Sequence, residues 1–398
     1  MQTPDPAAAG FDPGWLDRLG AAIERDIQAE RYDGCELVVA RGGRIGFHRQ
    51  FGFADRAAGR RVAAAQPFVT MSLGKQFLVA LVLQRIERGE FALTTRVADL
   101  IPAFAQRGKG RVTIAHVLTH TGGLPAMLPP GLALDQLASF PAMVDAACAA
   151  VLEFRPGSRV SYSALVAHAI LAECIRRVDG GGRPIRTILA DDLFGPLGMR
   201  DTALGCPGPL RERLAPVVAR DRRPGALDPE ALEALGAILD ETTEIPAAGY
   251  VSTAPDVHRF AEMLRGGGQL DGVRILSPAT VVALAVNHTG DEPNAFWAYT
   301  EDMRGWEPYP ANLGLGVYVR GEGVFPMPFG LLASPATFGG FGAGSTIFWV
   351  DPVRDVSYAF MSSGLMEDSH SIDRHQRLAD LVHAACLDEA PGCEHDDH

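Results

Sequence analysis

The pattern of apolar residues changes once within the first fifty positions, from a helical to a strand pattern. From about residue 13 to 30, apolar side chains such as Leu19 and Ile23 recur at helical spacing. From residue 36 to 48 two short segments of strand length and composition flank the turn residues Gly42-Gly43. This pattern predicts an amphipathic helix followed by an antiparallel hairpin.

A second hairpin is predicted near the other end of the chain. Two apolar runs, at 345–350 and 356–361, flank a turn with Asp351-Pro352 at its start. A helical pattern at about 371 to 388 follows.

The long stretch between the two hairpins has mostly helical periodicity, interrupted by Pro and Gly loops. The simplest architecture pairs both hairpins in one antiparallel sheet and packs the first and last helices on it. We therefore expect an α+β fold, with residues 1–70 and 310–398 in a sheet lobe and 71–309 in a mostly helical lobe. No repeat or low-complexity linker separates the lobes, so a single folding unit is expected, with the active site between them.

Composition narrows the classes of function. The chain has 398 residues with 47% hydrophobic content, enough for a sizeable core, and its net charge of −12 argues against nucleic acid as a partner. No apolar run reaches membrane-spanning length, and Met1–Pro6 lacks the features of a secretory signal. We expect a cytoplasmic protein that acts without a membrane.

The six cysteines are dispersed without metal-ligand spacing, so reduced thiols are expected in that compartment. The tail from Cys393 to His398 contains possible metal ligands, but terminal polar segments are usually disordered. No metal and no cofactor are predicted.

Acid–base chemistry is indicated at one of the two lysines. Lys and Arg number 36 together, yet lysine occurs only at Lys75 and Lys109. Lys75 follows Ser72 by three positions, which on a helix brings amine and hydroxyl to one face. An arginine stays protonated, whereas a desolvated lysine can act as a base. Arginine preference also follows from nucleotide composition alone, so the spacing by itself is only suggestive.

The setting of Lys75 strengthens this interpretation. The run Phe77–Leu83 is apolar on every side, which is typical of a helix buried all round. A lysine on the first turn of such a helix would be partly desolvated, and this lowers its pKa. The positive end of the helix dipole would lie beside Ser72.

Several further segments resemble the serine β-lactamase-like superfamily, which includes class C β-lactamases, DD-peptidases and family VIII carboxylesterases. The matching segments are Val112–Pro125, Phe194–Thr202 and Gly249–Asp256. They occur in the expected order between about residues 35 and 365, nearly the whole chain. The resemblance implies the β-lactamase/transpeptidase-like fold, and it is closest in kind to the family VIII carboxylesterases.

The resemblance also assigns roles to residues. Ser72 and Lys75 match the S-x-x-K motif that supplies the nucleophile and its lysine. Tyr162, in the segment Arg155–Ala164, matches the tyrosine of the second motif. Ala164 stands where the family usually has Asn, which removes hydrogen bonds to a substrate amide and disfavours β-lactamase or peptidase activity.

The third motif falls on Gly340-Phe341-Gly342 when counted back without gaps from the following strand, with Ala343 directly after it. A register shifted by two would use Phe338-Gly339-Gly340 instead, and the ungapped one is preferred. In both registers the first two positions lack Lys, His, Ser and Thr, so no side chain there binds a substrate carboxylate.

The predicted reaction is acyl transfer through a covalent intermediate on Ser72. Lys75 and Tyr162 together move the proton, and a neighbouring ammonium would favour the phenolate, so which of them is the base stays open. The backbone N–H groups of Ser72 and Ala343 are expected to hold the oxyanion. The histidines His116 and His120 are expected to be structural.

The substrate class follows from the missing cation, because a neutral ester needs no partner for a carboxylate. The sequence predicts a carboxylesterase acting on a small-molecule ester, with at most weak β-lactam hydrolysis. An acyltransferase of secondary metabolism and a catalytically reduced binding or regulatory homologue remain alternatives. The loop 124–133 and the aromatic segment Phe296–Tyr299, with Trp306 and Tyr309, either wall an acyl pocket or are surface loops.

Overall fold

The computed structural model describes residues 3–128, 132, 134–180 and 182–387. The tail from Cys393 to His398, considered above as a metal site, lies outside these residues.

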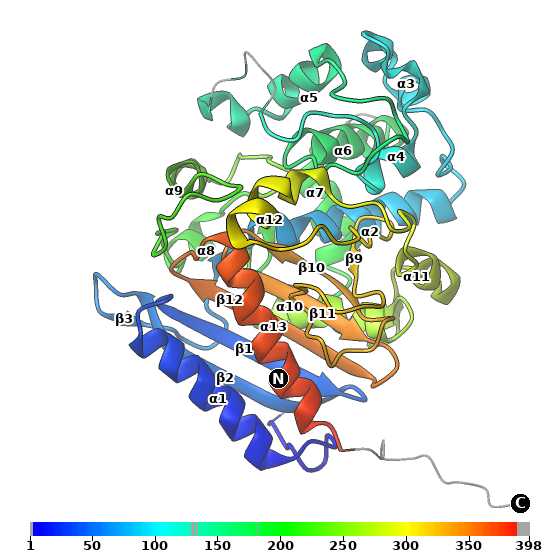
Figure 1. Ribbon diagram of the computed structural model, residues 1–398. Coiled ribbons are helices and arrows are strands. Elements are labelled where there is room, and N and C mark those ends of the chain that lie inside the picture. The colour runs from blue at the N-terminus through cyan, green and yellow to red at the C-terminus, as the bar shows by residue number, and fades with distance from the viewer. Residues whose placement is uncertain (1–2, 129–131, 133, 181, 388–398) are drawn as a thin grey trace, which may run out of the picture.

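One seven-stranded antiparallel sheet, in the order β3-β2-β1-β12-β11-β10-β9, forms the lower half of the molecule (Figure 1). Its strands are β1 (Gly34–Arg41), β2 (Arg44–Asp55), β3 (Arg60–Arg61), β9 (Tyr318–Val319), β10 (Phe338–Gly342), β11 (Thr346–Asp351) and β12 (Val356–Ser363). The terminal hairpins meet because β1 pairs with β12, with Leu37 opposite Phe360. Both predicted hairpins and their pairing in one sheet are therefore confirmed.

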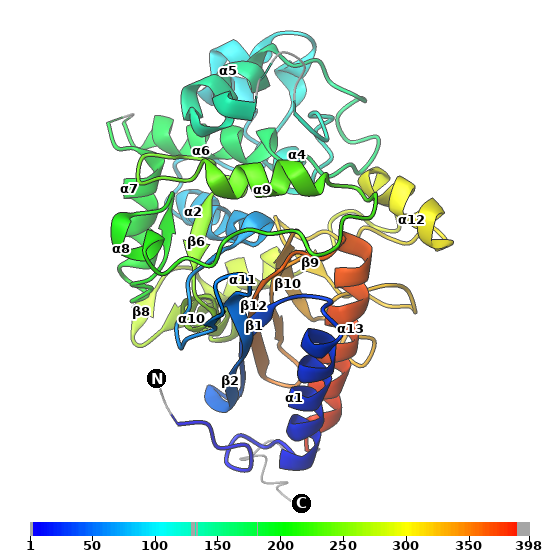
Figure 2. The same cartoon turned by 90° about the vertical axis from the view of Figure 1, so that its left-hand side faces the viewer.

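The first and last helices cover one face of this sheet, as predicted. They are α1 (Pro13–Gln28) and α13 (Asp368–Ala385), the latter beginning three residues before the expected position. Figure 2 shows them side by side on that face, with most of the other helices above the sheet or on its opposite side. Leu19 of α1, Trp349 of β11 and Leu378 of α13 are fully buried in the core between them.

The other face of the sheet packs on the helical part of the chain through aromatic rings. Helix α10 (Ala254–Arg265) lies against β11 and β12, and α2 (Lys75–Glu87) lies beyond it. Phe260 of α10 meets Phe348 edge-on at 5.5 Å and Phe77 of α2 at 4.9 Å between ring centroids. These contacts couple the sheet to the helix that follows Ser72.

The remaining elements are mostly short helices between β3 and β9. The helices are α3 (Val97–Leu100), α4 (Ile114–Leu118), α5 (Phe140–Ala149), α6 (Val166–Val178), α7 (Ile185–Leu189), α8 (Gly208–Arg211), α9 (Pro229–Ala237), α11 (Pro278–Leu284) and α12 (Ala298–Arg304). A small sheet of β4 (Phe68–Val69), β6 (Tyr250–Ser252) and β5 (Ala203–Leu204), and a hairpin of β7 (Gln269–Leu270) and β8 (Val273–Arg274), complete them. Among the described residues, no helix is both long and apolar enough to span a bilayer.

Helix α2 is buried along its length, as its apolar run predicted. Every residue from Lys75 to Arg85 is buried. A helix enclosed on all sides needs partners for its polar residues, and Arg85 near its carboxyl end has them.

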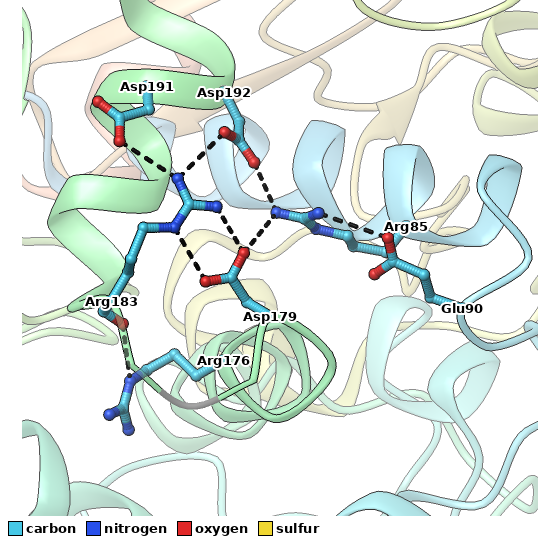
Figure 3. A network of polar contacts seen from close by, with 7 residues as sticks. All are labelled: Arg85, Glu90, Arg176, Asp179, Arg183, Asp191 and Asp192. Atoms are coloured by element: carbon cyan, nitrogen blue, oxygen red, sulfur yellow. Dashed lines mark hydrogen bonds and ion pairs between the residues drawn. The ribbon is translucent and has the colours of Figure 1, made fainter.

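Arg85 is the centre of an ion-pair network shown in Figure 3. Its guanidinium, 4% exposed, lies 2.6 Å from Asp192 and 3.5 Å from Asp179. Arg183 pairs with the same two aspartates from the opposite side. The network ties the end of α2 to the end of α6 and to the turn at 190–194.

We predict that Arg85→Met lowers the free energy of unfolding by about 3 kcal/mol, because it leaves two largely buried carboxylates short of a cation. Urea denaturation measures this. Arg96→Met is the matched control, since the Arg96–Asp99 pair is 60% and 44% exposed and such pairs contribute less than about 1 kcal/mol. Equal effects of the two substitutions would contradict the prediction.

Candidate active site

Ser72 and Lys75 lie together at the start of the buried helix, as the spacing predicted. Ser72 is in the short 3₁₀ turn Met71–Gly74 that leads into α2. The Lys75 Nζ lies 3.0 Å from Ser72 Oγ and donates to the carbonyl oxygen of Ala247 at 2.7 Å. Met71, directly before the serine, has a left-handed φ of 51°, a strained conformation that is frequent at functional sites.

The environment of Lys75 favours its neutral form. The side chain is 1% exposed, and this burial lowers the pKa of the amine well below its usual value. No carboxylate forms an ion pair with it among the described residues. A neutral amine with Ala247 as acceptor for one N–H has its lone pair free to take the hydroxyl proton of Ser72.

Tyr162 completes the group that the sequence predicted. Its ring centroid lies 5.1 Å from Lys75 Nζ, and its side chain is buried. Burial raises the pKa of Tyr162 above its ordinary value, while interaction with Ser72 opposes this in part. The ammonium that would favour a phenolate is itself disfavoured here, because burial also lowers the pKa of Lys75. The two pKa shifts favour Lys75 as the base and Tyr162 as a neutral phenol.

The backbone around Tyr162 is held at three consecutive N–H groups. Ser161 N donates to His120 O at 3.0 Å, and Ser163 N donates to His120 Nδ1 at 3.1 Å. Tyr162 N donates to Asn294 Oδ1 at 3.0 Å. Burial lowers the pKa of His120 to about 3, so its ring remains a neutral acceptor. His120 thus has the structural role expected from the sequence.

His116 is also structural. Its Nδ1 accepts from Thr113 N at 3.2 Å, while Thr113 Oγ1 accepts from His116 N at 3.3 Å. This reciprocal pair caps the amino terminus of α4.

The glycines of β10 let this strand lie directly against the segment that carries Ser72. A Cβ atom at Gly340 would lie 2.2 Å from Gln76 Oε1, and one at Gly342 would lie 2.3 Å from Thr70 O. Phe341 instead packs against Tyr318, with 4.7 Å between ring centroids. The register of the third motif stays a prediction from the sequence.

Ser72 and Ala343 line one mostly apolar cavity of about 110 Å³. The other lining residues are Met71, Met127, Leu128, Leu137, Ala164, Leu165, Leu227, Asp228, Ala231, Leu232, Leu235 and Ala248. Ala164 contributes a methyl group where an Asn would contribute an amide. The hydroxyl of Ser72 therefore opens onto a surface suited to a hydrocarbon chain.

The predicted walls of this cavity are only partly right. Met127 and Leu128 of the loop 124–133 line it, and residues 129–131 and 133 lie outside the described part of the chain. The aromatic segment does not line it among the described residues. Phe296 and Tyr299 line a neighbouring hollow of about 430 Å³. Of the two alternatives left open for this segment, the structure does not favour the one in which it walls the pocket at Ser72.

Trp297 and Tyr309 line a third, smaller cavity next to Phe341. Trp306 packs on Tyr309, with 6.5 Å between ring centroids. These aromatics anchor loops against β9 and β10 rather than line the cavity at Ser72.

The wall that sequence reasoning missed comes from α9 and the residues before it. In Figure 2 this helix lies across the middle of the molecule, between α4 and α6 on one side and the sheet on the other. The sequence signal was present in part, since Asp228-Pro229 is a typical helix start and Asp228 accepts from Glu230 N. Nothing in that local pattern indicates that Leu232 and Leu235 face Ser72.

Within the described residues, no group of three or more His, Cys, Asp and Glu side chains is placed to hold a metal ion. The described cysteines, at 35, 148, 174, 206 and 386, are free thiols.

Comparison with known proteins links this arrangement to a family. A family model described as beta-lactamase matches residues 19–382. The esterase EstB of Burkholderia gladioli is 30% identical over 294 residues, covering 66% of this chain and 73% of EstB.

Two solved structures match nearly the whole fold. A penicillin-binding protein homologue from Caulobacter crescentus superposes with a TM-score of 0.78 at 25% identity, covering 94% of this chain and 99% of its own. A family VIII carboxylesterase superposes with a TM-score of 0.75 at 21% identity, covering 95% and 98%. The predicted fold is therefore confirmed.

We predict a single acid limb in the pH profile of kcat/KM. Activity falls as the pH drops through the lowered pKa of Lys75, because protonation removes the base, and it stays level to about pH 9 because Tyr162 remains a phenol. Initial rates with p-nitrophenyl butyrate measure this, and Tyr162→Phe should keep the limb at reduced kcat. A limb that disappears in Tyr162→Phe would identify the tyrosine as the base instead.

Proposed function

The chain belongs to the beta-lactamase family, a hydrolase family with esterase members, and on that basis we propose that it cleaves neutral carboxylic esters through an acyl-enzyme on Ser72. The observation that supports this most is the apolar cavity shared by Ser72 and Ala343, with the desolvated amine of Lys75 behind the hydroxyl.

The first half of the proposed reaction forms the acyl-enzyme. Ser72 Oγ attacks the ester carbonyl carbon while its proton passes to Lys75 Nζ. The N–H groups of Ser72 and Ala343 stabilise the oxyanion of the tetrahedral intermediate. The intermediate collapses by breaking the bond to the alcohol oxygen, which takes the proton back from the Lys75–Tyr162 pair.

The second half returns the free enzyme. A water molecule attacks the acyl carbonyl as Lys75 accepts its proton, and the bond to Ser72 Oγ breaks. Ser72 Oγ recovers a proton from Lys75, and the carboxylic acid leaves. Lys75 thus alternates between base and acid, which a buried amine of lowered pKa can do near neutral pH.

The charge of the cavity supports a neutral substrate. Among the described residues that line the cavity, Asp228 is the single side chain that carries a charge, and this charge is negative. A β-lactam or a peptidoglycan stem carries a carboxylate, which Asp228 would repel and no lining cation would bind. A hydrocarbon acyl chain meets Met127, Leu232 and Leu235 instead.

Acyl transfer to an alcohol is a second candidate, supported by the hollow next to the site. That hollow shares Met127 with the Ser72 cavity and is lined by Phe296 and Arg159. It gives a leaving or an accepting alcohol room beside Tyr162.

The contact between Ser72 and Lys75 argues against the third candidate, a binding homologue without turnover. A cytoplasmic location stays a prediction from the sequence.

We predict that Ser72→Ala reduces hydrolysis of p-nitrophenyl butyrate at least 10³-fold, since no acyl-enzyme can form. Spectrophotometric assay measures the loss, and a fluorophosphonate probe should label the parent protein and not the variant. Ser158→Ala, which removes an exposed hydroxyl bonded to Arg155 O, is the control and should keep full activity.

Unchanged turnover in Ser72→Ala would refute the proposal. The same assay with an added alcohol separates the two catalytic candidates. Butyryl transfer that outpaces hydrolysis at modest alcohol concentration would favour the acyltransferase.

We predict that Leu235→Ala shifts chain-length preference toward longer esters. The substitution enlarges the cavity, and one or two extra methylenes in an apolar pocket change kcat/KM about 10-fold. The ratio of kcat/KM for octanoate over butyrate p-nitrophenyl esters should therefore rise.

Leu239→Ala is the matched control for this prediction. Leu239 is as deeply buried, at 1% exposed against 6% for Leu235, but it does not line the cavity. A ratio that rises equally in both variants would show loosened packing in place of a specificity wall.

A further inference from the structure

The turn between β10 and β11 carries Ala343, and it is held from behind by the last helix. Ser345 N donates to Gly342 O at 3.2 Å, and Gly344 has a left-handed φ of 57°. The N–H of Ala343 makes no hydrogen bond to another described residue. Its direction is therefore set by its neighbours in the turn.

Asp368 fixes the peptide group that follows Ala343. It is the first residue of α13 and is 7% exposed. Its Oδ1 accepts from Gly344 N at 3.0 Å. That N–H belongs to the peptide group that links Ala343 to Gly344. The hydrogen bond to Asp368 therefore fixes the peptide plane on the carboxyl side of Ala343.

Arg374 fixes the next peptide group. Its Nη2 donates to Gly344 O at 3.2 Å and to Ser371 Oγ at 3.0 Å. Its Nη1 lies 3.4 Å from Ser362 Oγ, which itself donates to Ser345 O at 2.7 Å. The two side chains of α13 thus bind both backbone polar groups of Gly344.

Burying Arg374 here is costly for stability. The side chain is 2% exposed and forms no ion pair with a described residue, and its Nε lacks a hydrogen-bond partner among them. It lies 4.6 Å and 5.1 Å from the ring centroids of Tyr32 and Phe360, and burial lowers its pKa. A cation kept in such a place without a carboxylate indicates a role in fixing the carbonyl that it binds.

The turn has no room to move toward α13. A Cβ atom at Gly344 would lie 2.1 Å from Met366 O, and Met366 N donates to Gly344 O at 3.2 Å. On its other side the turn borders the cavity of Ser72, through Ala343. Loss of a bond from α13 would therefore let the turn relax into the site.

We propose that Asp368 and Arg374 are positioning residues that hold the Ala343 N–H in the orientation needed to bind the oxyanion. The inference rests on the proposed acyl-transfer function. Neither side chain touches the substrate in this account, and both act through Gly344.

The test compares Asp368→Ala with Asp368→Asn, which keeps a carbonyl oxygen to accept from Gly344 N. Asp368→Ala should lower kcat for p-nitrophenyl butyrate about 10- to 100-fold with KM changed less than about 3-fold, since the loss arises in the transition state. The rate of fluorophosphonate labelling of Ser72 should fall in parallel. Asp368→Asn should restore most of both rates.

Arg374→Lys and Arg374→Met extend the test to the second contact. In Arg374→Lys the new side chain can still donate to Gly344 O, so kcat should stay within about 5-fold of the parent value. In Arg374→Met no donor remains, so kcat should fall by more than this. If Arg374→Met fails to fold, the two Asp368 variants, at the start of a helix, still decide the question.

Asp351→Asn is the matched control. Asp351 is fully buried and accepts from the backbone N–H of Ser334 and Val353, at the opposite end of β11. Asp351→Asn should lower the melting temperature but leave kcat for p-nitrophenyl butyrate close to the parent value.

Two failures are distinguishable. A parent protein that neither hydrolyses esters nor reacts with the probe would refute the proposed function. An active parent whose folded Asp368→Ala variant keeps the parent kcat and labelling rate would overturn the positioning role alone.

Discussion

Desolvation of one amine is the constraint on which the rest of the site depends. Lys75 can be a base only if it is buried without a counter-charge, and α2 provides this because every residue from Lys75 to Arg85 is buried. Enclosing a helix requires covering on every side. The sheet, α10 and α6 supply it through contacts such as Phe77 with Phe260, so the core of the molecule also determines the chemistry of the site. The carbonyl of Ala247 completes the arrangement by accepting an N–H of the amine.

The same logic extends outward from the serine. The glycines of β10 bring a strand into contact with the segment that carries Ser72, and the loop at Tyr162 is fixed by hydrogen bonds from three consecutive backbone N–H groups. Stability and reactivity are therefore separated in space. At the carboxyl end of α2, the buried Arg85 forms ion pairs that hold the helix in place. At the amino end, beside Ser72, lie the desolvated amine of Lys75 and the strained backbone of Met71.

Sequence reasoning succeeded where local spacing carries the information. The i, i+3 relation of Ser72 and Lys75, the Gly42-Gly43 turn and the two apolar runs that became β11 and β12 are all short-range patterns, and the structure has each of them. It failed where an answer depends on which distant segments meet. Leu235 and the carbonyl of Ala247 reach the site only through the tertiary fold. The choice between Lys75 and Tyr162 as the base was left open by the sequence, because it depends on how deeply each group is buried, which no motif reports.

The rarity of lysine has a consequence beyond the active site. Lys75 is engaged at Ser72, and Lys109 is fully buried with its Nζ donating to Ala150 O at 2.6 Å. Since the chain contains no other lysine, its folded surface offers no ε-amine to acetylation, ubiquitin attachment or amine-directed crosslinkers. Lysine-specific electrophiles would thus react with a lysine side chain only after partial unfolding. The rate of such labelling would therefore measure how often this molecule unfolds locally.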